Sequence, residues 1–509
     1  MYRISTATPS EPESFELPEE GKLSDENRWV IMANLIPWEK FEEEYAKSFC
    51  ENKGAPALPF RVAMSALIIQ ERLGISDRET VEQIRENPYL QYFIGLTNYQ
   101  TEAPFDASMM VYFRKRIKLN LLNKINQEMV KKGREILEDK ESDARTEERG
   151  EESERPNAGK LILDATCAPA DIKYPTDLDL LNQARQGTEK ILDCLYREVK
   201  DKLTKKPRTS RKIARKNYLK VAKKRRPSQK ERRKAIGQQL GYIQRNLGYI
   251  DQLIELGASL TCLSKRRYKM LLVIEEVSRQ QREMWSEKKT RVDQRIVSLS
   301  QPHVRPIVRG KAGKTTEFGA KLSVSCVDNY VFLHRLSWEN FNESQDLKAQ
   351  VENFKETYGC YPESVHVDKI YRTRENLAWC KERGIRLSGL PLGRPPKNRS
   401  AEIKKQAQED ESFRNAIEGK FGQAKRRFGL NLCMTKLPET SETSIALTFL
   451  VVNLSRLLRQ FFGLFLSFLI LGRTKELRCR QRFNKNYVKS DFTQVKLITW
   501  ATNYWHSIA

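Results

Sequence analysis

Several features that define other classes of protein are missing from this 509-residue sequence. No two of its nine cysteines have Cys-x-x-Cys spacing, and their number is odd, which argues against a zinc knuckle or a disulfide framework. The polar, acidic residues 1–22 contain no apolar stretch that could act as a signal peptide. We therefore expect reduced thiols in a cytoplasmic protein, with a disordered tail over residues 1–20.

The sequence also has little that could span a membrane, because its longest apolar segment, residues 445–471, is broken by charge. Asn453, Arg456 and Arg459 interrupt the segment, and the uninterrupted part, 461–471, covers only about 16 Å as a helix. A membrane span needs about 20 consecutive apolar residues. We predict a buried core helix here and no membrane partner.

What the sequence has in excess is positive charge. Its 91 Lys and Arg residues outnumber 66 Asp and Glu residues, which gives a formal net charge of +25. This surplus indicates a polyanionic partner, and we favour nucleic acid over an acidic membrane surface. Charge alone leaves a ribosome-associated or generally adhesive basic protein open. Since single cores stop growing at roughly 250–300 residues, more than one domain is expected.

Residues 21–136 are predicted to form an all-helical N-terminal domain. Within 59–74 the apolar side chains recur with helical spacing, and Gly74 is placed to end that helix. A capping box at 76–79 (Ser-Asp-Arg-Glu) then starts a second helix, which stops before Pro88. Two helices joined by so tight a turn can form a helix-turn-helix that binds DNA ends, or an ordinary helical hairpin. The residues leave both interpretations open.

The middle of the chain is predicted to be helical and basic. Residues 137–158 are dense in charge and indicate a linker, while residues 177–300 have little strand character. Between positions 203 and 234, 16 of 32 residues are Lys or Arg and one is acidic. A solvated face is the usual explanation of such a run, but the single sign favours contact with phosphates. We predict a basic helical insertion whose DNA contacts include Arg211, Arg215, Lys223 and Arg225.

Residues 159–176 and 301–472 are predicted to form one α/β domain that the insertion splits in sequence. Strand-like and helix-like segments alternate along them, and Asp328-Asn329 marks the turn of a β-hairpin. This order indicates a mixed sheet with helices rather than a sandwich or a bundle. Residues 473–509 are assigned to a C-terminal tail.

Two aspartates in this domain follow short apolar strands: Asp164 ends LILD, and Asp368 ends VHVD. Carboxylates at strand ends lie at the rim of a sheet, where open α/β sheets bind their ligands. Oxygen ligands of this kind suit two Mg²⁺ or Mn²⁺ ions, which together can catalyse phosphodiester displacement. The signal is weak by itself, because aspartates at strand ends are common turn residues.

A third acid, Glu418, lies on a predicted helix beside the apolar stripe that begins at Ile417. Arg414 lies four residues before Glu418 and Lys425 seven after it, on the same face. Such an acid can bind a metal ion while its cationic neighbours hold phosphates. The alternative is an ordinary helical salt bridge from Arg414 to Glu418, which the spacing alone slightly favours.

Four motifs that follow one another along the chain favour the metal site over the salt bridge. They are DATCAPADIKYPTD at 164–177, RGKAGKTTEFGAK at 309–321, VDKIYRTRENLAWCKERGI at 367–385, and R-x3-E-x6-K at 414–425. Together they resemble the bacterial insertion-sequence transposases of the insertion-sequence-five type. Residues 60–117 resemble the helical leader domain of that group. The resemblance extends from about residue 30 to residue 470.

The resemblance implies a ribonuclease-H-like, retroviral-integrase-like catalytic core with Asp164, Asp368 and Glu418 as a DDE triad that binds two Mg²⁺ or Mn²⁺ ions. The family usually has a tyrosine where this sequence has Glu411, so a tyrosine contribution to DNA positioning is absent or comes from elsewhere. The resemblance also implies phosphate contacts by these cations: Arg414, Lys425, Lys369, Arg309, Lys311 and Lys321.

The activity implied by the resemblance is cleavage of double-stranded DNA at the terminal inverted repeats of an insertion sequence, followed by strand transfer into target DNA. Water attacks a phosphodiester to release a 3′-hydroxyl, and that hydroxyl then attacks the target. A homodimer on paired ends, acting at the bacterial nucleoid, is expected. A nuclease that only cleaves, or an inactive DNA-binding relative, is the alternative, and the intact triad argues against the inactive one.

Overall fold

The structure is a computed structural model. It describes the backbone of residues 2, 14–18, 21–50, 54–142, 157–311, 314–389 and 401–483. Side chains are not described at 140–142, 309–311, 314–315, 401–404 and 464–483. Most of the linker and most of the C-terminal tail therefore lie outside the described residues. The disordered tail expected at 1–20 is wrong for its described residues, because Phe15 is buried and the Glu16 backbone is hydrogen-bonded to Thr97 and Tyr99. The chain divides into two compact units, Met1–Arg456 and Leu457–Ala509.

Short helices follow one another through the N-terminal part of the chain. They are α1 (Arg28–Leu35), α2 (Trp38–Ala46), α3 (Phe60–Leu73), α4 (Asp77–Glu86), α5 (Pro88–Ile94), α6 (Met109–Arg116) and the longer α7 (Leu119–Ser142). Gly74 ends α3 with a φ of +67°, a left-handed conformation that favours glycine. The Ser76 side chain then accepts a hydrogen bond from the Glu79 N–H and so begins α4. Both helix ends lie where the sequence places them.

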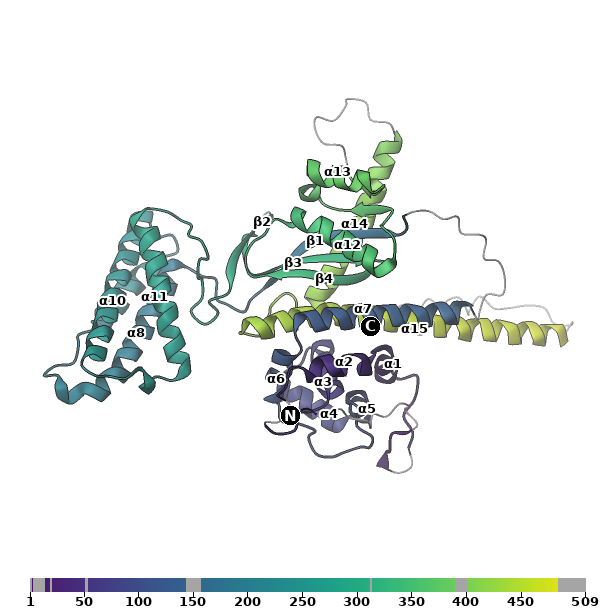
Figure 1. Ribbon diagram of the computed structural model, residues 1–509, viewed down its shortest axis with the longest axis horizontal. Coiled ribbons are helices and arrows are strands. Elements are labelled where there is room, and N and C mark those ends of the chain that lie inside the picture. Colours follow the sequence, from purple (N-terminus) through teal and green to yellow (C-terminus); the bar gives the residue numbers. More distant parts are fainter. Residues whose placement is uncertain are drawn as a thin grey trace. The chain divides into compact units, whose positions relative to one another are not determined.

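The α/β part contains a six-stranded mixed sheet (Figure 1). Its strands are β1 (Lys160–Pro169), β2 (Arg305–Lys311), β3 (Lys314–Val327), β4 (Tyr330–Ser337), β5 (Ser364–His366) and β6 (Arg386–Leu387). The strand order is β2-β3-β1-β5-β6, with β4 also paired to β3. β1, β5 and β6 are parallel to one another, whereas β3 is antiparallel to β1, β2 and β4. The mixed α/β class predicted from the sequence is therefore present.

The hairpin of β3 and β4 turns at Asp328 and Asn329, as expected. Both residues have positive φ, +49° and +65°, which matches the right-handed twist of a hairpin. At the other end of β3, Gly319 is required by packing, because a Cβ there would lie 2.0 Å from the carbonyl oxygen of Ala168 on β1. The long β3 can thus cross β1 closely and hold the full length of that strand.

Helices α12 (Leu347–Tyr358), α13 (Arg374–Glu382) and α14 (Ala401–Arg427) accompany the sheet. One buried apolar cluster joins β1 and β5 to α12 and α13; it includes Leu161, Leu163, Leu347, Val351, Val365, Val367 and Cys380. α14 contacts β1, β3 and β5. Two short 3-10 turns, η5 (Glu343–Asp346) and η6 (Lys369–Tyr371), are joined by Asn376, which donates to a carbonyl in each.

One helix in the described part of the chain is long and apolar enough to cross a membrane: Pro438–Gly463, within α15 (Pro438–Phe483). Seventy-two per cent of its most apolar window is buried inside the protein. Asn453, in the middle of this run, donates to Asn126 of α7 at 2.9 Å and accepts from the Val331 N–H of β4 at 2.8 Å. The α15 residues up to Arg456 therefore form part of the core, as predicted for a buried helix.

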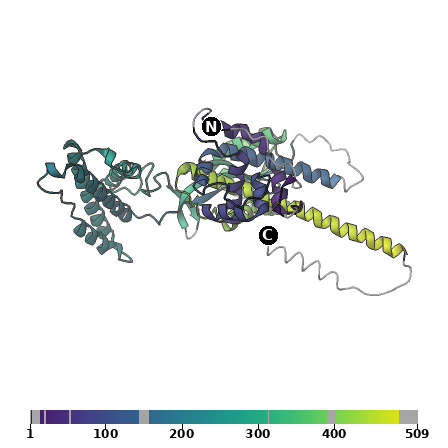
Figure 2. The ribbon, with the colours of Figure 1, turned by 90° about the horizontal axis from the view of Figure 1, so that it is seen from below.

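The insertion between β1 and β2 is a helical bundle. Its helices are α8 (Asp177–Val199), α9 (Arg211–Ala222), α10 (Gln229–Glu255) and α11 (Lys265–Ser286). Figures 1 and 2 show α8, α10 and α11 side by side. A buried polar group ties α8 to α10: the Arg185 guanidinium bonds Glu189 and Asn182 on its own helix and Gln239 across the interface.

Candidate active site

Asp164 lies in the middle of β1 rather than at its end, which corrects the expectation from the sequence. β1 continues to Pro169 because β3 pairs with it from Ile162 to Pro169. The parallel neighbour β5, however, pairs only with Lys160 to Ile162. Beyond that point one side of β1 is free of β5, and the partly buried Asp164 lies on this unpaired stretch.

Asp368 follows β5 at the same height as Asp164. The last register pair of the two strands joins Ile162 to His366, and each aspartate lies two residues beyond its member of that pair. The charge of Asp368 acts on the Asp164 carboxyl, so the two aspartates lie within electrostatic reach of each other. The Asp368 carboxylate accepts a hydrogen bond from the Lys369 N–H at 2.6 Å and is otherwise exposed.

The electrostatics of Asp164 agree with this placement. Burial raises the pKa of its carboxyl to about 6, while the Ala165 N–H and the charge of Arg414 act to lower it, and the charges of Glu343 and Asp368 raise it further. The Ala165 N–H lies 2.8 Å from one carboxylate oxygen. A buried acid beside a second acid is poorly stabilised by the protein alone, and a bound cation would relieve it.

Glu418 lies on α14 next to the fully buried Ile417. Its side chain is 54% exposed and accepts a hydrogen bond from Arg414 Nη1 at 3.1 Å. Arg414 also donates to Glu411 at 2.7 Å, and its own side chain is only 18% exposed. The hydrogen bond to Glu411 and the charges of Glu411, Glu418 and Asp164 raise the pKa of Arg414. The Arg414–Glu418 salt bridge, which the sequence offered as the alternative to a metal site, is thus present. The charge of Asp164 also acts on Arg414.

These contacts decide how well the site fits a divalent cation. Asp164 and Asp368 provide neighbouring carboxylates with free oxygens, as a hard cation requires. Among the described residues, no group of three acidic, histidine or cysteine side chains is arranged to hold a metal ion. Glu418 is hydrogen-bonded to Arg414 instead.

Comparisons with known proteins identify the family. Residues 18–116 match a family model described as "Transposase domain (DUF772)", and residues 365–455 match one described as "Transposase DDE domain". "Uncharacterized protein ORF8 in nfe locus" of Rhizobium meliloti is 34% identical over 157 residues, which are 31% of this chain and 69% of that protein. The chain belongs to the DDE transposases of insertion sequences. No solved structure matches it.

Transposases of this family cut and rejoin DNA, so the placement of the expected phosphate-binding cations matters. Lys369 is exposed next to Asp368. Lys321 is instead engaged: its ammonium lies 3.3 Å from Glu343 and donates to the Phe341 carbonyl at 2.7 Å. Lys425 is partly buried on α14. The side chains of Arg309 and Lys311 lie outside those described.

The expected cations of the insertion also differ from one another. Arg211 is tied into the bundle, because its guanidinium donates to the Asp193 carboxylate at 2.6 Å and to the Glu189 carbonyl at 3.1 Å. Arg215, Lys223 and Arg225 are exposed. The structure therefore separates one structural arginine from three cations that face solvent.

Sequence reasoning missed an ion-pair group that fixes α14 to the sheet. Asp410 is buried on α14, accepts two hydrogen bonds from Arg386 of β6 at 2.8 and 2.9 Å, and lies 3.5 Å from the buried His366 of β5. Glu418 is two helical turns further along α14. The group therefore positions the helix that carries Glu418. One signal was readable, since Asp410 is seven residues before Ile417 and hence on the buried stripe.

The second helix of the N-terminal pair, α4, carries exposed charges of both signs. It exposes Glu79, Glu82 and Glu86 together with Arg78, and its Arg85 is paired with Glu82 at 2.6 Å. The helix-turn-helix that binds DNA ends and the ordinary hairpin therefore both stay predictions.

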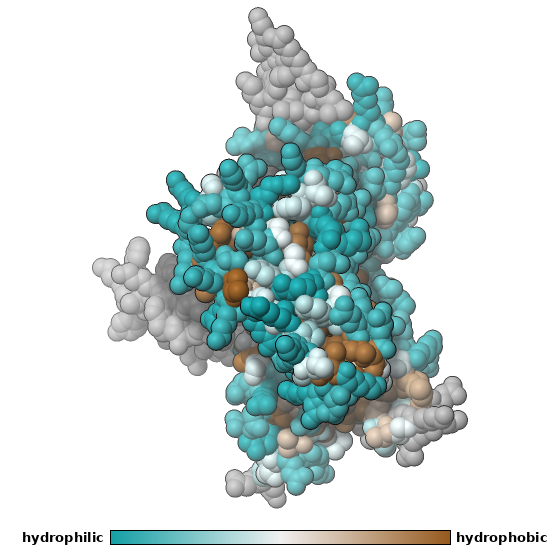
Figure 3. All heavy atoms as spheres, turned by 90° about the vertical axis from the view of Figure 1, so that its left-hand side faces the viewer, coloured by the Kyte–Doolittle hydropathy of each residue, from teal (hydrophilic) through white to brown (hydrophobic). Residues whose placement is uncertain are grey.

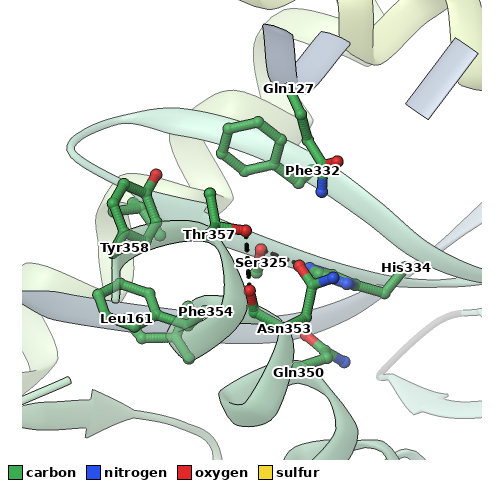
Figure 4. Close-up of a pocket in the computed structure, with 11 residues that line it drawn as sticks. Gln127, Leu161, Ser325, Phe332, His334, Gln350, Asn353, Phe354, Thr357 and Tyr358 are labelled. Atoms are coloured by element: carbon green, nitrogen blue, oxygen red, sulfur yellow. Dashed lines mark hydrogen bonds between the residues drawn. The ribbon is translucent and has the colours of Figure 1, made fainter. Parts of the chain in front are cut away.

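A small interior cavity lies away from the triad, between α7, α12 and the β3-β4 hairpin (Figure 4). Its volume is about 20 Å³, enough for one water molecule. Polar groups line it, among them Ser325 and His334, which are hydrogen-bonded to each other at 2.7 Å. The cavity is too small for a nucleotide and has no part in the candidate active site.

Proposed function

We propose that this transposase cleaves double-stranded DNA at the ends of its insertion sequence and joins them to target DNA at one active site formed by Asp164, Asp368 and Glu418. The observation that carries the proposal is the equal offset of Asp164 and Asp368 beyond the pair of Ile162 and His366. It is the arrangement expected of a ribonuclease-H-like core, to which we assign this sheet.

Asp164, Asp368 and Glu418 would together hold two Mg²⁺ or Mn²⁺ ions. When bound, the ions would supply Lewis-acid stabilisation for the charge that develops on the phosphodiester oxygens. The pKa of about 6 for Asp164 means that this carboxyl is mostly ionised at neutral pH and available as a ligand.

The role of Arg414 follows from its contacts. A DNA phosphate that enters beside Asp164 competes with Glu411 and Glu418 for the guanidinium, which binds phosphate in a bidentate manner. Its binding to DNA would release Glu418 toward the two aspartates. Lys369 and Lys425 are assigned to neighbouring DNA phosphates. Arg309 and Lys311 are assigned to further phosphates of the DNA.

The reaction needs no protein nucleophile. Water attacks the phosphodiester at the end of the element, the bond to the leaving oxygen breaks, and a 3′-hydroxyl is released. In strand transfer that 3′-hydroxyl attacks a phosphodiester of target DNA and displaces a second 3′-oxygen. Cleavage of two ends implies two copies of the site, and hence a homodimer on paired ends at the nucleoid.

The test is to incubate the full chain with Mg²⁺, labelled duplexes that carry the terminal repeats of its element, and a supercoiled target plasmid. Cut ends together with products joined to the plasmid are expected. Cut ends without joined products would instead indicate a nuclease that only cleaves. No cutting of repeat-bearing DNA would contradict the proposal.

A further inference from the structure

Helix α9 of the insertion has two opposite faces. Ala214 and Val221 are buried against the bundle. At 100° per residue, the exposed cations lie on the other side, within an arc of about 140°. They are Lys212, Arg215, Lys216, Lys220 and Lys223, the last of them the C-cap residue. We call these five side chains the α9 stripe.

The α9 stripe is held in place by contacts on its flank. Gln239 of α10 donates to the Ala214 carbonyl at 3.1 Å, and Arg245 of α10 donates to the Thr209 carbonyl at 3.0 Å. Arg211 at the start of α9 is fixed by Asp193 of α8. Two neighbouring helices thus hold α9 in one orientation. A ligand that binds the α9 stripe would therefore avoid the entropic cost of ordering this helix.

The charge of the α9 stripe is not neutralised within the described part of the chain. Nearby cations do have acidic partners: Lys206 pairs with Asp193 at 2.7 Å, and Lys224 pairs with Glu231. None of the five stripe cations forms an ion pair with a described acid. The face of the protein seen from the side of the bundle is mostly hydrophilic, with only scattered apolar side chains (Figure 3).

The neutral polar side chains of α9 are used inside the bundle. Asn217 donates to the Tyr242 hydroxyl at 3.1 Å, and the Tyr218 hydroxyl donates to Asp179. Amides such as Asn and Gln are the side chains that read adenine in the major groove. With Asn217 engaged, the exposed face of α9 offers cations that can bind phosphates and no amide that could read adenine.

We propose that the α9 stripe binds duplex DNA through its phosphates, without reading the base sequence. The inference rests on the proposed function only in taking DNA as the partner. From Lys212 to Lys223 the helix rises about 16 Å. A stripe of this length can meet several phosphates of a DNA duplex. This binding site would hold target or flanking DNA, whose sequence is not fixed.

The test uses the full chain with five Lys or Arg residues replaced by Gln at the stripe: Lys212→Gln, Arg215→Gln, Lys216→Gln, Lys220→Gln and Lys223→Gln. Glutamine is a good helix former, so α9 is retained. The control loses the same charge elsewhere in the bundle, at exposed positions: Lys265→Gln, Arg266→Gln, Lys269→Gln, Lys288→Gln and Arg291→Gln. Circular dichroism and thermal melting establish that both variants fold like the parent.

Binding is measured by fluorescence anisotropy in EDTA, with two 30-base-pair duplexes of unrelated sequence, over a range of salt concentrations. For the stripe variant we expect affinity to fall about tenfold or more for both duplexes. The slope of log Kobs against log salt should flatten by about 3–4, since each phosphate contact contributes about 0.9. The control should stay within about threefold of the parent.

Equal weakening of both variants would show a general effect of net charge and overturn the proposal. So would stronger stripe-dependent binding to single-stranded RNA or to vesicles of phosphatidylserine than to duplex DNA. Because the measurement needs neither metal nor terminal repeats, failure here is separate from failure of the proposed cleavage. If the parent cuts DNA ends and the stripe variant binds DNA as well as the parent, the triad assignment stands and the α9 stripe proposal is wrong.

Discussion

Arg414 donates a hydrogen bond to Glu418 one turn further along α14, at 3.1 Å, and a second to Glu411, at 2.7 Å. Glu418, the third acid of the triad, is therefore hydrogen-bonded to the arginine proposed to bind phosphate when no DNA is bound. A DNA phosphate bound by Arg414 would compete for its guanidinium and favour their separation. Binding of DNA and completion of the triad are thus expected to be coupled.

Glu411 stands where related transposases usually have tyrosine, and it competes with DNA for Arg414. We expect Glu411→Gln to strengthen binding of terminal-repeat DNA about two- to fivefold, since exposed ion pairs contribute about 0.2–1 kcal/mol. Anisotropy titration in the absence of metal measures this. Glu409→Gln removes an exposed charge two residues away on the same helix and is the control. Unchanged or weaker binding by Glu411→Gln would show that Glu411 does not restrain Arg414.

Asp164 is expected to destabilise the metal-free protein at neutral pH. Its folded-state pKa of about 6 is raised above the ordinary value of 3.8, so the stability of the parent falls as pH rises from about 4 to 6. Asp164→Asn removes the charge, and we expect it to stabilise the EDTA-treated protein by about 1–3 kcal/mol at pH 8. At pH 4 the two proteins should unfold alike. Urea denaturation at both pH values measures the difference, and a variant less stable than the parent at pH 8 would refute the assigned burial.

The group of buried Asp410 and His366 with the exposed Arg386 predicts a structural effect on the third acid. Asp410→Asn leaves Arg386 without its charged partner, and we expect a loss of about 1–2 kcal/mol in unfolding free energy. End cleavage should fall more than DNA binding, because α14 carries Glu418 and the weakened contact lies two turns away. Glu409→Gln again provides the control. Full cleavage activity in a clearly destabilised Asp410→Asn chain would show that the group does not position Glu418.

The part of the site that the sequence predicts depends on local patterns. Helix spacing and Gly74 give the ends of α3 and α4, and Asp328-Asn329 gives the hairpin. The short apolar runs before Asp164 and Asp368 give the strands β1 and β5, although β1 continues past Asp164. These signals lie within a few residues of the feature they predict.

What the sequence does not predict depends on pairing between distant segments. β1 continues past Asp164 because β3, more than 150 residues later, pairs with it. Lys321 and Arg211 both look like free cations in sequence, but Glu343 and Asp193 are brought to them by the fold. The spacing of Asp410 from Ile417 indicates that it is buried, but its partner Arg386 on β6 is brought to it only by the fold.

Single-turnover cleavage of a duplex carrying the terminal repeat, in Mg²⁺, tests the triad most directly. The parent is compared with Asp164→Asn, Asp368→Asn and Glu418→Gln, and with Asp328→Asn at the β3-β4 turn as a matched control. Each triad variant is expected to cut about a thousandfold or more slowly while folding normally, and the control is expected to cut at the parental rate. Cleavage within tenfold of the parent by any one triad variant would contradict the assignment of that residue.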